Sequence, residues 1–136
     1  MAVTANQKIT ARNQRSRVGV PVASSKHIYQ GTMAFIASGY LTDVSGATGT
    51  NQLAGIVIDE KDNSSGSNGD LTAEVYEEGS FLLTGSGFAQ SDVGSKVYAS
   101  DNYTITKTST NNSPVGRIDE FVSSTQVMVQ IDKQQM

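Results

Sequence analysis

A strand pattern that occurs twice is the feature of this chain that most constrains its fold. Residues 36–42 (Ile-Ala-Ser-Gly-Tyr-Leu-Thr) are echoed by residues 98–105 (Tyr-Ala-Ser-Asp-Asn-Tyr-Thr-Ile), and residues 55–60 (Gly-Ile-Val-Ile-Asp-Glu) by residues 116–120 (Gly-Arg-Ile-Asp-Glu). The offset is 62 residues for the first echo and 60 for the second, so order and spacing both carry over. Each copy predicts a hairpin, a loop and a return strand, followed by one further strand. The pattern favours an internal two-fold duplication of a β unit, with chance similarity between hairpins as the alternative.

Apolar patterning predicts strands along most of the chain. Residues 53–59 form a nearly continuous apolar run, which is typical of a strand buried on both faces. Residues 71–75 alternate between apolar and polar side chains with a period of two, and so do residues 126–132. The expected fold is therefore all-β, a small β-barrel or β-sandwich.

Turn signals separate the expected strands. Asp101-Asn102 tolerates the positive φ of a type I′ hairpin turn, and Ser38-Gly39 turns the chain in the first copy. The polar stretch over residues 61–70 is expected to be an exposed loop. Residues 88–94 form the one connector in which we allow a helical turn.

Basic side chains are concentrated at the N-terminal end of the chain. Residues 1–27 hold five basic side chains and no acidic one, whereas the other 109 residues hold five basic and thirteen acidic ones. Pro21 excludes a helix interior and favours an extended path. We therefore expect an extended basic N-terminal arm over residues 1–25, attached to an acidic β-barrel or β-sandwich domain over residues 26–136.

Composition excludes several classes of protein. The chain has no cysteine, so neither disulfides nor thiolate metal sites contribute. Its start lacks the apolar segment of a secretory signal, and no window approaches the length of a membrane span, so we expect synthesis in a cytoplasm and no membrane partner. Apolar residues make up only 37% of the chain, which favours burial against copies of itself or against a larger partner.

Residue chemistry gives little support to catalysis. The single histidine, His27, stands beside Lys26, and no serine lies in a Gly-x-Ser-x-Gly elbow. A general base also requires an orienting partner and a cleft. The neighbouring acids of the chain, such as Asp59-Glu60, point to opposite faces of a strand and do not converge on one atom. We therefore expect no enzyme activity and no cofactor.

The loop from Asp59 to Asp70 invites comparison with a calcium site. An EF-hand loop that began at Asp59 would have Lys61 at its third position and Ser64 at its sixth, where an oxygen ligand and a glycine are required. Weak cation binding by Asp62, Asn63 and Asp70 stays open, but a solvated turn-rich loop is the favoured interpretation.

Nucleic acid is a weaker partner than protein for the basic arm. Five cations can grip phosphates, yet the body is acidic and aromatic residues make up only 7% of the chain. The sequence shows no pattern of interleaved aromatic and basic residues for stacking on bases. We expect a protein-docking arm and no direct nucleic-acid contact.

The succession of short strand patterns over residues 27–132 resembles the capsid cement, or decoration, proteins of tailed bacteriophages. The segments that carry the resemblance are residues 53–59, 69–75, 78–83, 92–98, 104–106, 115–118 and 127–131. The resemblance implies a small β-barrel or β-sandwich that clusters, often as a homotrimer, on the outside of an icosahedral head. Its partners would be the major capsid protein and other copies of itself, and it would stabilise the virion against the pressure of packaged DNA.

The basic arm departs from many relatives, whose chains begin close to the first strand, so it offers a separate means of docking. We expect an extended arm to add a strand to an exposed capsid sheet while its cations pair with acids of the shell. The candidate capsid contacts are Arg12, Arg15, Arg17, Val18, Val20 and Val22. The alternative is another adhesive β-module of a virion, such as a head fibre base, a tail component or a carbohydrate-binding domain.

Overall fold

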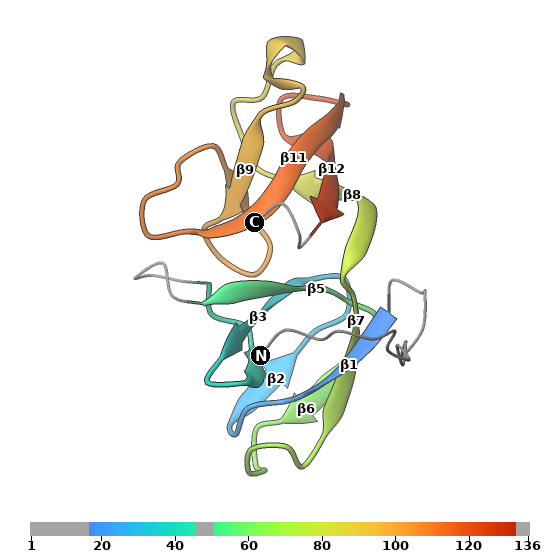
Figure 1. Ribbon diagram of the computed structural model, residues 1–136, viewed down its shortest axis with the longest axis vertical. Helices are drawn as coiled ribbons and strands as arrows, with labels where there is room; N and C mark the ends of the chain where they lie inside the picture. The colour runs from blue at the N-terminus through green and yellow to red at the C-terminus, as the bar shows by residue number, and fades with distance from the viewer. Residues whose placement is uncertain (1–16, 46–50, 133–136) are drawn as a thin grey trace, which may run out of the picture.

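The computed structural model describes residues 17–45 and 51–132, which form strands and one short 3-10 helix (Figure 1). The first half of the chain holds β1 (Arg17–Pro21), β2 (Lys26–Ile28), β3 (Met33–Ala37), β4 (Tyr40–Thr42), β5 (Gln52–Val57), β6 (Lys61–Asn63) and β7 (Thr72–Tyr76). The second half holds β8 (Glu78–Thr84), the 3-10 helix η1 (Gln90–Asp92), β9 (Lys96–Ala99), β10 (Ile105–Thr106), β11 (Ser113–Phe121) and β12 (Gln126–Asp132). The predicted all-β fold is confirmed, and η1 lies in the connector where a helical turn is expected.

The strands form two five-stranded sheets and one small pair. The first sheet has the order β1-β7-β5-β3-β4, the second has the order β10-β9-β11-β12-β8, and β2 pairs with β6. Neighbouring strands run antiparallel throughout. Each sheet curls until its two edge strands approach each other, because a parallel bridge joins Val22 to Leu41 in the first sheet and Thr84 to Thr104 in the second. Each sheet is therefore a half-closed barrel.

The two half-barrels are built in the same way. Strands β1, β3, β4, β5 and β7 follow one another along the chain as β8, β9, β10, β11 and β12 do. If β1, β3, β4, β5 and β7 are matched in turn with β8, β9, β10, β11 and β12, the two sheets have the same strand order. That order is β1-β7-β5-β3-β4 in the first sheet and β8-β12-β11-β9-β10 in the second. Matching topology in the two halves is what an internal duplication requires, and it agrees with the echoes in the sequence.

A β-bulge recurs at the corresponding position of both units. Ala54 is the extra residue of β5 opposite β3, and Val115 is the extra residue of β11 opposite β9. Both bulge side chains are buried. The next residue is a glycine in each unit, and a Cβ on Gly55 or Gly116 would lie 2.0 Å from a carbonyl oxygen of the neighbouring strand. The strands β5–β7 and β11–β12 can approach this closely only because these two positions carry no side chain.

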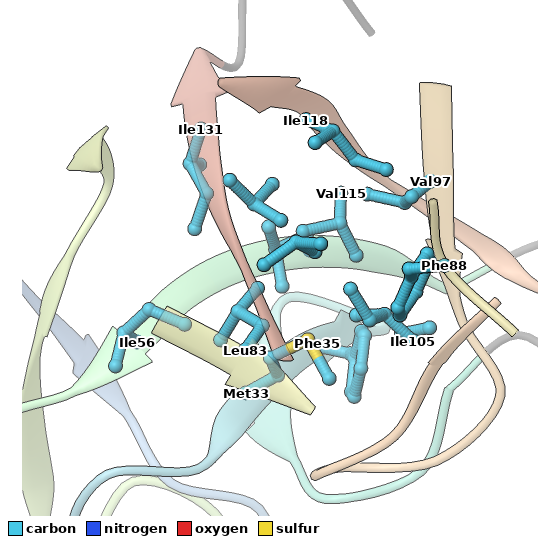
Figure 2. Close-up of a cluster of buried hydrophobic side chains, with 14 residues drawn as sticks. Met33, Phe35, Ile56, Leu83, Phe88, Val97, Ile105, Val115, Ile118 and Ile131 are labelled. Atoms are coloured by element: carbon cyan, nitrogen blue, oxygen red, sulfur yellow. The ribbon is translucent and has the colours of Figure 1, made fainter. Parts of the chain in front are cut away.

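Each half-barrel has a core of its own buried apolar side chains. In addition, side chains on the outer face of the first half-barrel pack into the core of the second. The core of the first unit is formed by Val22, Ile28, Ala34, Leu41, Ala54, Val57, Ala73 and Val75. The larger cluster contains buried residues of the second unit together with four residues from the outer face of β3 and β5 (Figure 2). Those four residues are Met33, Phe35, Leu53 and Ile56. The two units therefore stack with a shared core, one above the other along the long axis in Figure 1.

The second unit does not repeat this apolar outer face. Met33 pairs with Ile56 across β3 and β5, and the corresponding pair across β9 and β11 is Lys96 with Arg117. Lys96 and Arg117 are exposed, whereas Met33 and Ile56 are buried. The stacking surface is therefore present once, on the first unit only.

The boundary of the expected arm requires a correction. Residues 17–21 are not part of an extended tail, because β1 pairs with β7 along its whole length and Val22 is fully buried. Alternating apolar residues in this segment fill the first core, which explains why the segment belongs to the sheet. Residues 1–16 lie outside the described part of the chain.

Of the two predicted hairpin turns, one forms as expected and the other does not. Ser38-Gly39 has positive φ at both residues, at 52° and 86°, and so forms the type I′ geometry in the first unit. In the second unit neither Asp101 nor Asn102 is among the described residues with positive φ. The Asp101 carboxylate instead accepts hydrogen bonds from the backbone amides of Tyr103 and Thr104, at 2.8 and 2.7 Å. The predicted type I′ turn is wrong there because this side chain supports a longer loop.

We predict that Gly116→Ala destabilises the protein by about 2 kcal/mol or more, because the new Cβ would force β11 away from β12. Urea unfolding followed by circular dichroism measures the change. Gly31→Ala is the matched control, since Gly31 has φ of 78° but open space around its Cβ position. We expect a cost of about 1 kcal/mol at Gly31. Equal losses in the two variants would contradict the close approach of the strands.

Candidate binding surface

The expected capsid-contact residues divide into two groups. Arg12 and Arg15 lie outside the described residues. The other four, Arg17, Val18, Val20 and Val22, lie in or next to β1. Val18 and Val20 pack against the first core, and Val22 is part of that core. Val22 is fully buried, whereas Val18 and Val20 are partly buried and keep some exposed surface.

Arg17 is engaged within the first unit. Its guanidinium donates a hydrogen bond to the Glu74 carboxylate of β7, and the two residues form an ion pair at the surface. That hydrogen bond, with the charge of Glu74, raises the pKa of Arg17. Exposed ion pairs of this kind add little stability, typically below about 1 kcal/mol, so the contact orients the start of β1 more than it stabilises the fold.

His27 lies in a surface cluster on β2. Its Nε2 hydrogen bonds to the Glu60 carboxylate, its Nδ1 lies 3.7 Å from an oxygen of Asp62, and its ring stacks on Tyr29 with 4.0 Å between the ring centroids. The nearby Ser64 hydroxyl donates to Asp62 and not to the imidazole. The cluster thus places the Glu60 carboxylate on Nε2 and the Asp62 carboxylate near Nδ1, while the Ser64 hydroxyl is engaged with Asp62.

The polar stretch over residues 61–70 is more ordered than a simple exposed loop. It begins with β6, and Asn63 at the end of that strand is buried. The side-chain amide of Asn63 donates to the carbonyl oxygens of Val22, Ala23 and Ser67, at 3.4, 3.0 and 3.0 Å. One side chain therefore fastens the loop to the segment that follows β1.

These contacts leave little capacity for a cation at the same loop. The Asn63 amide nitrogen is directed at carbonyl groups, the Asp62 carboxylate accepts from the amide and hydroxyl of Ser64, and Asp70 accepts from the Ser67 amide at 2.9 Å. These hydrogen bonds from Ser64 lower the pKa of Asp62. Among the residues that the structure describes, no group of three or more potential metal ligands comes together.

Asp92 joins two loops of the second unit. Its carboxylate accepts a hydrogen bond from the Ala89 amide at 2.9 Å and forms an ion pair with Lys107 at 3.1 Å. The Ala89 hydrogen bond, followed by Lys107, lowers the pKa of Asp92 below its ordinary value of 3.8. The contact fixes the 3-10 turn against the loop that follows β10.

Two exposed apolar side chains lie on β8 and on the loop before β10. Leu82 and Tyr103 are 48% and 57% exposed, which is high for side chains of their size. They line a small pocket whose other lining residues are Gly31, Met33, Leu83, Thr84 and Asn102. Exposed apolar groups at a strand edge are typical of a surface that binds another chain.

The charge of the described part contrasts with that of the segment before it. Residues 17–132 hold thirteen acidic and six basic side chains, whereas residues 1–16 hold Lys8, Arg12 and Arg15 and no acid. Opposite charge on two parts of one chain favours contact between them or between copies, and it makes such contact sensitive to salt.

Comparison with known proteins gives no relative for this chain. No family model, no curated protein and no solved structure matches it. Within residues 17–45 and 51–132 there is also no helix long and apolar enough to cross a membrane.

We predict that Asn63→Asp lowers the free energy of unfolding by about 2–3 kcal/mol, because a carboxylate would replace an amide donor that faces buried carbonyl oxygens. Urea unfolding at pH 7 gives the change. Asp62→Asn provides the comparison at the adjacent exposed position, where we expect a change below about 1 kcal/mol. An Asn63→Asp variant as stable as the native chain would contradict the buried fastening.

We also predict that Asp92→Asn weakens the dependence of stability on acid. A carboxyl group whose pKa is lowered by folding stabilises the protein above pH 3.8, and this contribution is lost as the pH falls through the lower folded-state pKa. Urea midpoints measured between about pH 6 and pH 2 should therefore fall less steeply in Asp92→Asn. Lys107→Met should reduce the slope by a smaller amount, since the Ala89 amide is the larger cause. Identical slopes in native protein and Asp92→Asn would refute this assignment.

Proposed function

We propose that the protein is a non-enzymatic decoration, or cement, protein of a tailed-phage head, which binds the outer capsid surface and stabilises the shell. The observation that carries the proposal is the agreement between strand order and the segments that resemble such proteins. Those segments fall on β5, β7, β8, β9, β10, β11 and β12 in sequence. A compact pair of half-barrels with an exposed strand edge is a suitable body for a protein whose task is adhesion.

The shared core supports a mechanical role. Fourteen buried residues from both units pack in one cluster, so a force on one unit is carried by apolar contacts into the other. A subunit that bridges capsid proteins must resist such forces without opening. The Val22–Leu41 and Thr84–Thr104 bridges also bring the two edge strands of each sheet together at one point, so that each sheet is half-closed.

The docking model changes with the position of β1. Arg17 is paired with Glu74, Val22 is buried in the first core, and Val18 and Val20 are partly buried against it. Capsid binding through the basic segment would therefore fall to residues 1–16, which carry Arg12 and Arg15. A deletion that extends to residue 25 would remove β1 and Val22, so it would test folding and not docking.

We predict that the full chain co-sediments with expanded heads of the phage that encodes it, up to a fixed number of copies per shell. Heads without the protein should lose DNA at lower temperature than heads to which it has been added back. Sedimentation and a dye-accessibility melt of the packaged DNA measure the two effects. Absence of saturable binding to expanded heads, with folded protein, would rule out the proposal.

Deletion of residues 2–16 tests the contribution of the basic segment. Because residues 17–132 contain both sheets, we expect the truncated chain to keep its melting temperature within about 3 °C. Its affinity for heads should drop about tenfold or more, with a smaller dependence on salt. Gln7→Ala, which keeps all three cations of the segment, is the matched control and should bind as the native chain does. A glycan array on the same preparations tests a carbohydrate-binding module.

A further inference from the structure

Two cations lie directly opposite each other on the outer face of the second sheet. Lys96 and Arg117 are strand partners across β9 and β11, and both side chains are exposed. At the next position along these strands, the Ile118 amide donates to the Ser95 carbonyl at 2.9 Å. Because hydrogen-bonded pairs alternate with the other kind in an antiparallel ladder, Lys96 and Arg117 form the other kind of pair, whose side chains lie closest together.

Neither of these cations has a counter-ion in residues 17–45 and 51–132, which hold six basic side chains. Four of the six form ion pairs with acidic side chains, namely Arg17, Lys26, Lys61 and Lys107. Arg117 instead donates a hydrogen bond to the Gly94 carbonyl at 3.2 Å. Like charges on directly opposite residues are destabilising, so the free protein carries a cost that a bound anion would remove.

The pair is the positive end of a row of hydrogen-bond donors that crosses the sheet. Gln130 of β12 is the strand partner of Arg117, and Ser80 of β8 is the partner of Gln130. Both side chains are exposed. Neighbouring strands lie about 4.8 Å apart, so the row covers about 14 Å of the outer face. The Ser80 hydroxyl already donates to Asp119 at 3.3 Å, which leaves Lys96 and Arg117 as the groups available to an anion.

The corresponding face of the first unit is itself a contact surface. Met33 and Ile56 hold the positions of Lys96 and Arg117 there, and both belong to the core shared with the second unit (Figure 2). The second unit presents the same face to the outside, with charged side chains in place of apolar ones. A partner for this face therefore has to supply negative charge and not an apolar surface.

Carboxylates of another protein fit this face better than the phosphates of a nucleic acid. Residues 17–132 hold thirteen acidic and six basic side chains, so most of the surface repels a long polyanion. Asp119 and Glu120, which follow close after Arg117 on β11, are exposed acids near the site. This repulsion acts less on a short acidic segment than on a continuous chain of phosphates.

We infer, on the basis of the proposed function, that Lys96 and Arg117 form a docking site for an acidic segment of the capsid protein. The site is separate from the basic residues that precede β1. Carboxylates of the shell would pair with both cations and remove the repulsion between them. Since β9 and β11 are held in the sheet, this contact needs no ordering of a segment on binding.

The full-length double variant Lys96→Gln/Arg117→Gln tests the site on expanded heads that contain no DNA. We expect it to bind these heads about tenfold more weakly than the native chain, because two surface ion pairs are lost. The difference should be largest at about 0.1 M salt and should vanish near about 1 M salt, where charges are screened. Co-sedimentation over a range of protein and salt concentrations measures both effects.

Lys26→Gln/Lys61→Gln is the matched control. It changes the net charge by the same amount, but its two cations already form ion pairs with Asp43 and Asp59. This control should bind heads as the native chain does. Lys96→Arg, which keeps the positive charge on β9, should also bind as the native chain does.

The melting temperature of the free protein separates a docking role from a structural one. Removal of two opposed like charges should leave the melting temperature of Lys96→Gln/Arg117→Gln unchanged or higher. A lower melting temperature together with weaker binding would mean that the two cations serve the fold, and the docking site would then be rejected.

Binding to heads also separates failure of this site from failure of the proposed function. Equal binding by the native chain and by Lys96→Gln/Arg117→Gln would overturn the site and leave the proposed function intact, whereas a native chain that does not bind heads would overturn both. Sedimentation of the protein alone and with duplex DNA tests other occupants of this face. Oligomers or DNA complexes that form with the native chain but not with the double variant would assign the face to a second copy or to nucleic acid, and would overturn its assignment to the shell.

Discussion

The burial of one apolar strand face between the two half-barrels is the interaction on which the rest of the structure depends. Met33, Phe35, Leu53 and Ile56 point away from the core of their own unit and into the core of the other. A half-barrel of five short strands buries too little surface for much independent stability. Because each unit completes the other, we expect the chain to unfold as one cooperative body, although its architecture is a repeat.

Most of the fold could be predicted from residues whose effects are local. Alternation in β7 and β12, the apolar run of β5 and the Ser38-Gly39 turn each determine their structure through near neighbours. The predictions that failed depended on contacts between distant parts of the chain. β1 is a strand in which Val18, Val20 and Val22 alternate and enter a core formed mainly by later residues; the alternation is visible in the sequence, but the strand that it pairs with is not. Asn63 looks like an ordinary loop residue until the carbonyl groups after β1 are placed beside it.

Less of the candidate binding surface than of the fold could be predicted from the sequence. The sequence indicates a basic segment and an acidic body, because charge can be counted without coordinates. It does not indicate which strand edge is open, since Leu82 and Leu83 are indistinguishable by type and only their places in the sheet make one exposed and the other buried. Arg17 was expected to contact a partner, but Glu74, two residues from its strand partner Tyr76 in β7, accepts its hydrogen bond.

The pair formed by Lys96 and Arg117 has a consequence for how far the architecture can grow. These two cations occupy the positions that Met33 and Ile56 hold in the first unit. A third half-barrel stacked on this face would therefore have to bury two hydrated positive charges in place of an apolar contact surface. Stacking of molecules face to face into rods is therefore disfavoured. The outer face of the second unit therefore does not offer the apolar surface that joins the two half-barrels, and further assembly would have to use other surfaces, such as strand edges.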